Sequence, residues 1–247
     1  MKKTPQLVKK PFAHHLLELR MRLLWVVAIF IIGSVIGYFF SNPLITVILY
    51  PLHQSVYYTS PIGGFNVVMT ISLLVGILTA IPMLLYQSFL FAKPLLPVSL
   101  IRKAPWVIFF SFFLLLIGIL FAYFVALPAS LHFFAKFSTS EVKSLISAND
   151  YLSFVTRYLV GFGILFQLPL ILLIINSVIP LSFIVLLSMQ RYVIVGAFLM
   201  GAILSPDPFN MFLMAGPIIF LFYLSVILIL VVNNRKRGIK KRRKNNS

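Results

Sequence analysis

The chain has 247 residues, of which 61% are hydrophobic and 10% charged, against about 45–50% apolar and about 25% charged residues in soluble domains, so a soluble globular fold is excluded. Lys and Arg outnumber Asp and Glu 21 to 4, a net charge of +17, but the basic residues stand in short clusters between long uncharged stretches, which favours a membrane protein over a nucleic-acid binder. The absence of cysteine excludes disulfides, thiolate metal sites and cysteine nucleophiles.

The uncharged stretches predict an all-α membrane protein with six spans, because each crossing needs about 20 apolar residues. The first stretch follows a basic segment and has no small-residue cleavage site after it, so we interpret it as an uncleaved helix. The expected spans are about 23–40, 65–92, 106–127, 151–175, 191–205 and 209–232. Residues 233–247 form a basic tail, and residues 1–247 make one membrane domain.

The distribution of Lys and Arg predicts that both termini are cytosolic. Basic residues precede the first span, follow the second, occur at Arg191 and fill the tail, and six crossings place all of these on one side. The fifth span, 191–205, then has only 15 residues, about 22 Å of helix against roughly 30 Å of hydrocarbon. We therefore expect a short fifth crossing.

Several residues inside the predicted spans shape the helices or add polarity. Pro82 and Pro217 would bend their helices, and the Gly33 to Gly37 segment is a close-packing pattern. Arg157 lies about 9 Å deep in the fourth span and either snorkels outward, which we favour, or faces water. Gln167, further along the same span, either faces a functional surface or only bonds a neighbouring helix.

The sequence offers no catalytic or metal-binding set. Asp150 and Asp207 both fall at outer ends of spans, so no carboxylate pair stands at membrane depth. His14 and His15 are adjacent and cannot share a helix face, and the other histidines have no neighbouring carboxylate. We therefore expect no enzyme, no metal and no cofactor. The basic tail could bind RNA or anionic lipid by charge alone, but we interpret it as a topology anchor.

Glu18 is one of only four acids and lies on one helical face with His14 and Arg22, just before the first span. A solvated, self-paired face would explain this pattern equally well. Residues 15 to 23, HLLELRMRL, resemble the HLxELRxRL opening of the TatC family, the multispanning receptor subunits of twin-arginine protein translocases. The resemblance continues to about residue 232 through Tyr50-Pro51-Leu52, Pro82 with Tyr86-Gln87, Tyr151 to Val155, Gly161 to Gly163, Arg191-Tyr192-Val193 and Ser205-Pro206-Asp207.

The resemblance implies a six-helix, glove-shaped receptor with short fifth and sixth spans that binds the Arg-Arg motif of signal peptides on its cytosolic face. Family members move folded proteins across the membrane with single-span TatA and TatB partners, using the proton-motive force and no bound cofactor. We therefore expect a homo-oligomer within a complex, contact with membrane lipid and no nucleic acid. The implied location is the bacterial cytoplasmic membrane or an organellar membrane of bacterial descent.

The resemblance also assigns individual residues. The implied signal-peptide site consists of Glu18, Arg20, Phe91 and Pro94, and the candidate contacts within the membrane or with partners are Gln167, Arg157, Asp207 and Tyr223. Three positions lack the family's acid, because Leu100, Gln167 and Tyr223 stand there. The chain is then either a divergent translocase with altered signal recognition, which we favour, or a homologue with another substrate. The alternatives from other classes are a small-molecule or ion transporter along Arg157 and Gln167, and a membrane scaffold.

Overall fold

A computed structural model of the chain shows an all-helical architecture, with no strand among the residues that it describes. These are residues 12–52, 54–91, 102, 104–136, 145–179, 181–204 and 207–245. Six helical segments are long and apolar enough to cross a membrane: Leu19–Phe39, Gly63–Phe91, Ala104–Ala135, Ala148–Val178, Phe183–Ala202 and Met211–Asn234. The prediction of an all-α protein with six spans is therefore confirmed.

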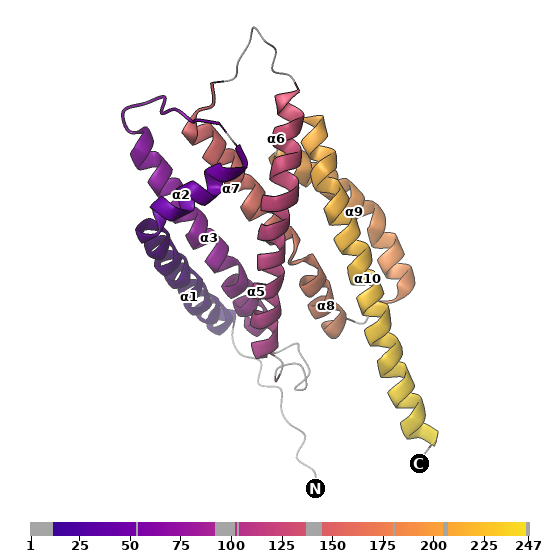
Figure 1. The fold of residues 1–247 in the computed structure, drawn as a ribbon. Coiled ribbons are helices and arrows are strands. Elements are labelled where there is room, and N and C mark those ends of the chain that lie inside the picture. Colours follow the sequence, from indigo (N-terminus) through magenta and orange to yellow (C-terminus); the bar gives the residue numbers. More distant parts are fainter. Residues whose placement is uncertain are drawn as a thin grey trace.

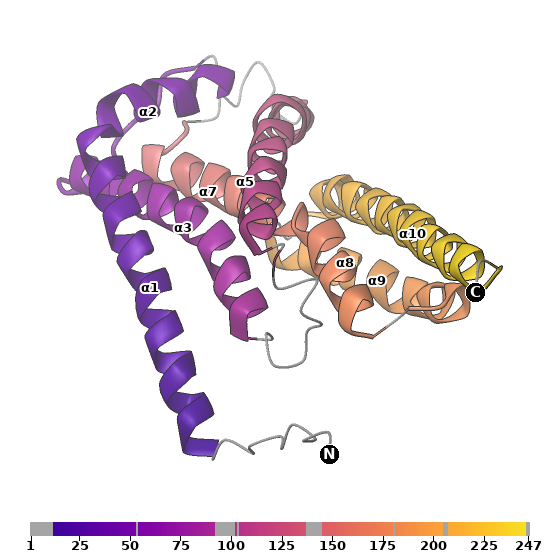
Figure 2. The ribbon, with the colours of Figure 1, turned by 90° about the horizontal axis from the view of Figure 1, so that it is seen from below.

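The first half of the chain builds a helical pair and a short cap. The helices are α1 (Phe12–Phe39), α2 (Ser41–Leu49), η1 (Tyr50–Leu52) and α3 (Gly63–Phe91). α1 lies along α3 (Figure 1), and small residues allow this close approach, since a Cβ on Gly33 would collide with Thr79 and one on Gly76 with Ser34. α2 runs across one end of this pair (Figure 2).

The third span is one continuous helix with a π turn inside it. It consists of α5 (Ala104–Phe121), the π turn η3 (Ala122–Ala126) and α6 (Leu127–Ala135). Pro128 has no N–H to give to the carbonyl one turn before it, and the Leu127 N–H bonds the Ala122 carbonyl, five residues back, instead of the usual fourth. The proline therefore accounts for the local change in helix geometry.

The second half of the chain contains the most buried span and one of the two least buried spans. The helices are α7 (Ala148–Leu165), α8 (Leu168–Val178), α9 (Phe183–Leu204) and α10 (Pro208–Asn245). Pro169 in the first turn of α8 explains why α7 and α8 are separate helices. Tyr158 and Phe162 of α7 are fully enclosed, whereas α1 and α9 bury only 11% of their apolar windows. The core therefore lies along α7.

The fifth span begins earlier than the sequence predicts. α9 starts at Phe183, eight residues before Arg191. The helix carries Arg191 on an exposed side, with its guanidinium 5.0 Å from the Tyr192 ring, so this cation does not mark the start of the span. Stacking and snorkelling allow a cation at such a position. The span of 20 residues is about 30 Å long and reaches across the hydrocarbon. The fifth and sixth spans, of 20 and 24 residues, remain shorter than the 29, 32 and 31 residues of the second to fourth.

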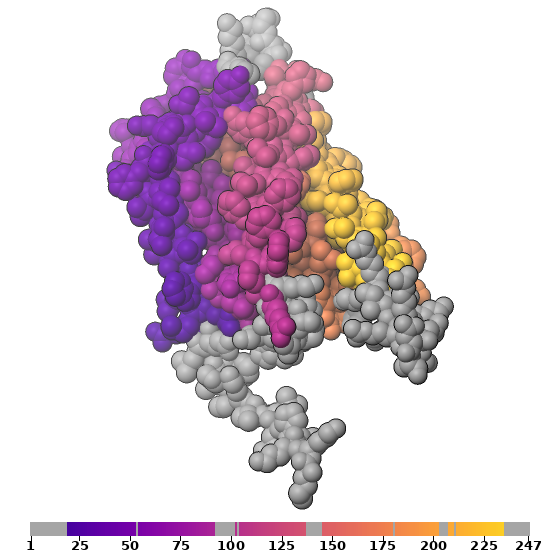
Figure 3. Space-filling model, turned by 60° about the horizontal axis from the view of Figure 1, so that its bottom comes forward, coloured from indigo at the N-terminus to yellow at the C-terminus, as the bar shows by residue number. Residues whose placement is uncertain are grey.

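The helices begin and end at two opposite ends of the molecule (Figure 1). At the lower end of Figure 1, α1 and α5 begin and α3, α8 and α10 end, and we call this the predicted cytosolic end. At the upper end lie α2 and the starts of α7 and α10, and we call this the predicted outer end. In the space-filling view, the surface of the α5 segment separates that of α1 from that of α10 (Figure 3).

Candidate functional site

A contact between side chains of α1 and α3 lies toward the predicted cytosolic end. Arg22 of α1 donates a hydrogen bond from Nη1 to Oε1 of Gln87 in α3, at 3.4 Å. Gln87 is buried and Arg22 is half-buried, so the bond is partly shielded from the surroundings. It joins two residues that are 65 positions apart in the sequence.

This bond brings together two helical turns that the sequence analysis assigned to the site. Glu18 precedes Arg22 by four residues in α1, and Phe91 follows Gln87 by four residues in α3. Residues four apart share a helix face, and α1 and α3 run in opposite directions (Figure 1). The turns of Glu18 and Phe91 therefore lie side by side, one turn closer to the predicted cytosolic end than the Arg22–Gln87 contact.

The predicted site residues differ in how much of them the structure describes. Phe91 ends α3 with 39% of its side chain exposed, and Arg20 is exposed on α1. Glu18 is helical, but its side chain lies outside the described part, as do Pro94 and Leu100 entirely. An exposed aromatic ring beside an acid-bearing turn can receive a guanidinium group, which stacks on rings and pairs with carboxylates in two parallel bonds.

Gln167 lies inside the protein rather than on an accessible surface. Its Nε2 donates to the carbonyls of Ser111 and Gly163 at 3.0 and 3.4 Å, and its Oε1 accepts a bond of 2.9 Å from the Ser111 hydroxyl. Only 1% of the residue is exposed. These bonds connect the α7–α8 junction to α5, as the packing interpretation expects, and another protein could reach Gln167 only if these helices separated.

The other three candidate contacts belong to α7, to the residue before α10 and to α10 itself. Arg157 is exposed on α7, and its Nε donates to the Ser153 carbonyl at 3.3 Å, one turn toward the predicted outer end. Asp207 is half-buried directly before α10, and Tyr223 is 40% exposed in the middle of α10. The outward direction of Arg157 is the geometry of a snorkelling cation.

A pair of asparagines that the sequence analysis missed ties the second half together. Asn176 of α8 and Asn233 of α10 exchange two amide hydrogen bonds of 3.1 and 3.2 Å. Asn176 Oδ1 also accepts from the Leu181 N–H at 2.9 Å, and Asn233 Nδ2 donates to the Leu181 carbonyl at 3.2 Å. The link between α8 and α9 is thereby attached to α10. The two residues are 57 positions apart, so no local pattern indicates the pair.

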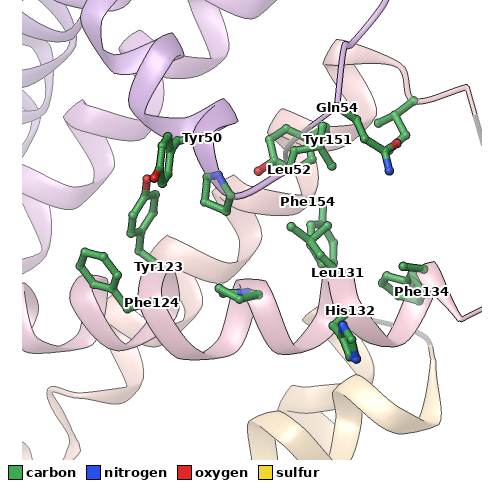
Figure 4. A pocket seen from close by; sticks show the side chains of 14 residues that line it. Tyr50, Leu52, Gln54, Tyr123, Phe124, Leu131, His132, Phe134, Tyr151 and Phe154 are labelled. Atoms are coloured by element: carbon green, nitrogen blue, oxygen red, sulfur yellow. The ribbon is translucent and has the colours of Figure 1, made fainter.

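At the predicted outer end, two tyrosine hydroxyls bind carbonyls of α2, and a pocket lies beside them. Tyr123 donates its hydroxyl to the Val47 carbonyl at 2.7 Å, and Tyr151 donates to the Ile48 carbonyl at 2.9 Å. Both carbonyls belong to the last turn of α2, and that of Val47 also accepts a bond from the Tyr50 N–H directly after the helix. Beside them lies a pocket of about 950 Å³, shown in Figure 4. Its lining includes Tyr50, Leu52, Tyr123, Leu131, Tyr151 and Phe154.

Comparisons with known proteins agree on one family. The family model described as Sec-independent protein translocase protein (TatC) matches residues 14–217. Among curated relatives, TatC of Aquifex aeolicus (strain VF5) is 33% identical over 238 residues, which cover 94% of this chain and 99% of that protein. The chloroplastic TATC of Oryza sativa subsp. japonica is 34% identical over 215 residues, 84% of this chain and 59% of that protein. A crystal structure of the twin arginine translocase receptor TatC matches with a TM-score of 0.79 and 32% identity, covering 89% of this chain and 99% of that chain.

Proposed function

Since this chain belongs to the TatC family of Sec-independent protein translocase proteins, we propose that it acts as the receptor subunit of a twin-arginine translocase. Its six apolar helices, together with bacterial and chloroplastic relatives, make it an integral membrane protein of a bacterial cytoplasmic membrane or of an organellar membrane of bacterial descent. Its task is to bind the signal peptides of folded proteins at the predicted cytosolic end, and the proton-motive force drives their transport.

The observation that carries the proposal is the pairing of the Glu18 and Phe91 turns beside the Arg22–Gln87 bond. Of the four acids in the sequence, Glu141, Asp150 and Asp207 belong to predicted outer positions, so Glu18 is the acid on the predicted cytosolic side. An Arg-Arg motif therefore has one carboxylate of this chain to pair with, and the Phe91 ring offers a second, stacking contact. Leu100, which stands at the family's acidic position, adds no charge.

The Arg22–Gln87 bond supports this site by fixing the two turns relative to each other. Arg22 shares a helix face with Glu18, and Gln87 shares one with Phe91. A site of this kind needs its groups held at a set spacing, because a guanidinium pairs best when the geometry is preformed. We assign Arg22 and Gln87 as positioning residues, with Arg20 and Pro94 as further parts of the signal-peptide site.

The proposed partners are TatA- and TatB-type single-span subunits and further copies of this chain. The apolar windows of α1 and α9 are only 11% buried, so these helices offer long faces that lipid or a partner helix can cover. Among the candidate contacts, Tyr223 and Arg157 are exposed and accessible to such helices, and Asp207 stands at the start of α10. Gln167 would take part only through the helices that enclose it.

Photocrosslinking tests the receptor function directly. Photoreactive residues at positions 18, 91 and 100 are exposed to a twin-arginine signal peptide and to its Lys-Lys variant in native membranes. We expect crosslinks at 18 and 91 that are selective for Arg-Arg, because a bidentate carboxylate contact distinguishes guanidinium from ammonium. A photoreactive residue at Phe113, on an exposed face of α5, serves as control. Equal crosslinking of both peptides to folded protein would mean that the family fold is kept with a different ligand.

A further inference from the structure

The pocket at the predicted outer end is large and lies where the helices leave the hydrocarbon. It measures about 950 Å³ and is lined by the last part of the third span together with η1 and the first turns of α7. Its Tyr123 and Phe124 belong to the third span, within the range 106–127 that the sequence assigns to the membrane, and Leu131 follows two turns later. The pocket therefore opens at the depth where the outer leaflet meets water.

The pocket wall is largely apolar, with Gln54 and His132 as polar residues beside two tyrosines whose hydroxyls are engaged. The hydroxyls of Tyr123 and Tyr151 donate to the α2 carbonyls of Val47 and Ile48, and the remaining wall consists largely of apolar side chains such as Leu131 and Phe154. Figure 4 shows these rings and aliphatic groups around the space. The wall therefore offers apolar contact and few hydrogen bonds to an occupant.

This chemistry separates two classes of occupant. A peptide segment brings an N–H and a C=O with every residue, and each of these groups costs free energy if it enters an apolar space without a partner. A hydrocarbon chain brings none, so it gains the full benefit of burial. Among the described residues that adjoin the lining in the sequence, Lys136 follows Ala135 and Asp150 precedes Tyr151, and both are exposed. Charges of both signs suit a zwitterionic head group.

We propose that this pocket binds one acyl chain of a zwitterionic phospholipid from the outer leaflet, with the head group at the rim near Lys136 and Asp150. The lipid fills the space between α2, α6 and α7 and so supports the attachment of α2. The site is separate from the signal-peptide site and does not depend on the proposed receptor function.

The test uses phosphatidylcholine that carries a photoreactive diazirine on its acyl chain, in vesicles that contain the full-length protein. After illumination, the labelled peptides are identified by mass spectrometry. We expect labels to concentrate on the pocket segments 123–135 and 146–154. Leu131→Trp should reduce this labelling about tenfold, the effect of excluding roughly two methylene groups from the pocket. Leu120→Trp, on an exposed face of the third span, should leave it unchanged.

Ala135→Trp provides a second variant, because Ala135 is exposed at the pocket and its replacement narrows the mouth without touching the core. If Leu131→Trp fails to fold, reduced labelling in Ala135→Trp still supports the proposal. Labels spread evenly over all lipid-facing segments, or equal labelling of the pocket in Ala135→Trp and wild type, would overturn it. Displacement of the label from the pocket by a signal peptide, with peptide crosslinks at Leu131, would also overturn it and identify a peptide as the occupant.

Discussion

The two ends of the molecule are held together in different ways. At the predicted outer end, Tyr151 anchors α2, Tyr57 joins the two outer loops through hydrogen bonds to Ile146 and Ala148 of 3.1 and 2.9 Å, and Phe133 stacks on Phe209 at 4.0 Å. At the predicted cytosolic end, the Arg22–Gln87 hydrogen bond of 3.4 Å joins α1 to α3, and the amides of Asn176 and Asn233 hold the end of α8 to α10.

This difference agrees with the proposed division of roles. Segments that bind ligands are often held by fewer contacts than the rest of a protein. The outer end brings together loops far apart in sequence and keeps them in place. At the cytosolic end, Phe91 at the end of α3 is 39% exposed. Variants at the outer end, in the middle of the membrane and at the cytosolic end test this comparison.

We expect the largest effect at the outer end. Tyr151→Phe should lower the free energy of unfolding by about 2 kcal/mol, because the buried Ile48 carbonyl loses its partner. Tyr123→Phe is the matched control, since its bond to Val47 is exposed, and should cost less than about 1 kcal/mol. Thermal unfolding in detergent measures both variants. Equal losses would show that burial does not distinguish the two anchors.

The middle of the membrane should respond almost as strongly. Gln167→Leu removes three hydrogen bonds with Ser111 and Gly163 and should lower the free energy of unfolding by roughly 1–2 kcal/mol. A double-mutant cycle with Ser111→Ala checks that the loss comes from this pair. A folded Gln167→Leu variant of full stability that no longer transports protein would instead identify Gln167 as a partner contact.

At the cytosolic end, Glu18→Gln should weaken binding of an Arg-Arg signal peptide about tenfold, or about 1.4 kcal/mol. The neutral amide loses the charge of the carboxylate, and the chain has no second acid on that side. Crosslinking yield against peptide concentration measures the effect. Glu141→Gln, in a predicted outer loop, is the control and should bind as wild type. Unchanged binding in Glu18→Gln would contradict the assigned role.

A smaller effect is expected from Gln87→Leu, which removes the acceptor of the Arg22 bond. Because this residue only positions the two turns, signal-peptide binding should fall about threefold, or about 0.7 kcal/mol. The free energy of unfolding of the protein should stay the same, because the contacts at the outer end are unchanged. Ser88→Ala changes the neighbouring exposed residue and is the control. If Gln87→Leu binds as tightly as wild type, the Arg22–Gln87 bond does not position the site.

The architecture was largely predictable because its determinants are local. Runs of apolar residues predicted the six spans, and the glycines of α1 indicated a close helix contact that the structure forms with α3 at Gly76. The start of α9 was missed because a single cation at Arg191 outweighed the apolar residues before it, although a helix can carry such a cation on an exposed side.

The candidate site was predictable only in part, because its contacts join distant segments. The motif around Glu18 and the position of Phe91 were assigned by resemblance, whereas a solvated face remained an open explanation for Arg22 and its bond to Gln87 was not foreseen. Tyr151 and Ile48 are 103 residues apart and Asn176 and Asn233 are 57 apart. No periodicity within a helix carries information about such pairs, so they require the three-dimensional arrangement.

The π turn at Ala122–Ala126 makes the orientation of α6 at the outer end depend on a single residue. A π turn accommodates one residue more than an α turn, and one residue corresponds to about 100° of rotation. Deleting a single codon there would convert the segment to a regular helix and rotate every later residue of α6. Ser130 would turn away from the Tyr158 hydroxyl that it meets at 2.7 Å, and the pocket would lose its Leu131 wall. The pocket wall at Leu131 and the Ser130–Tyr158 contact therefore both depend on the extra residue that the π turn accommodates.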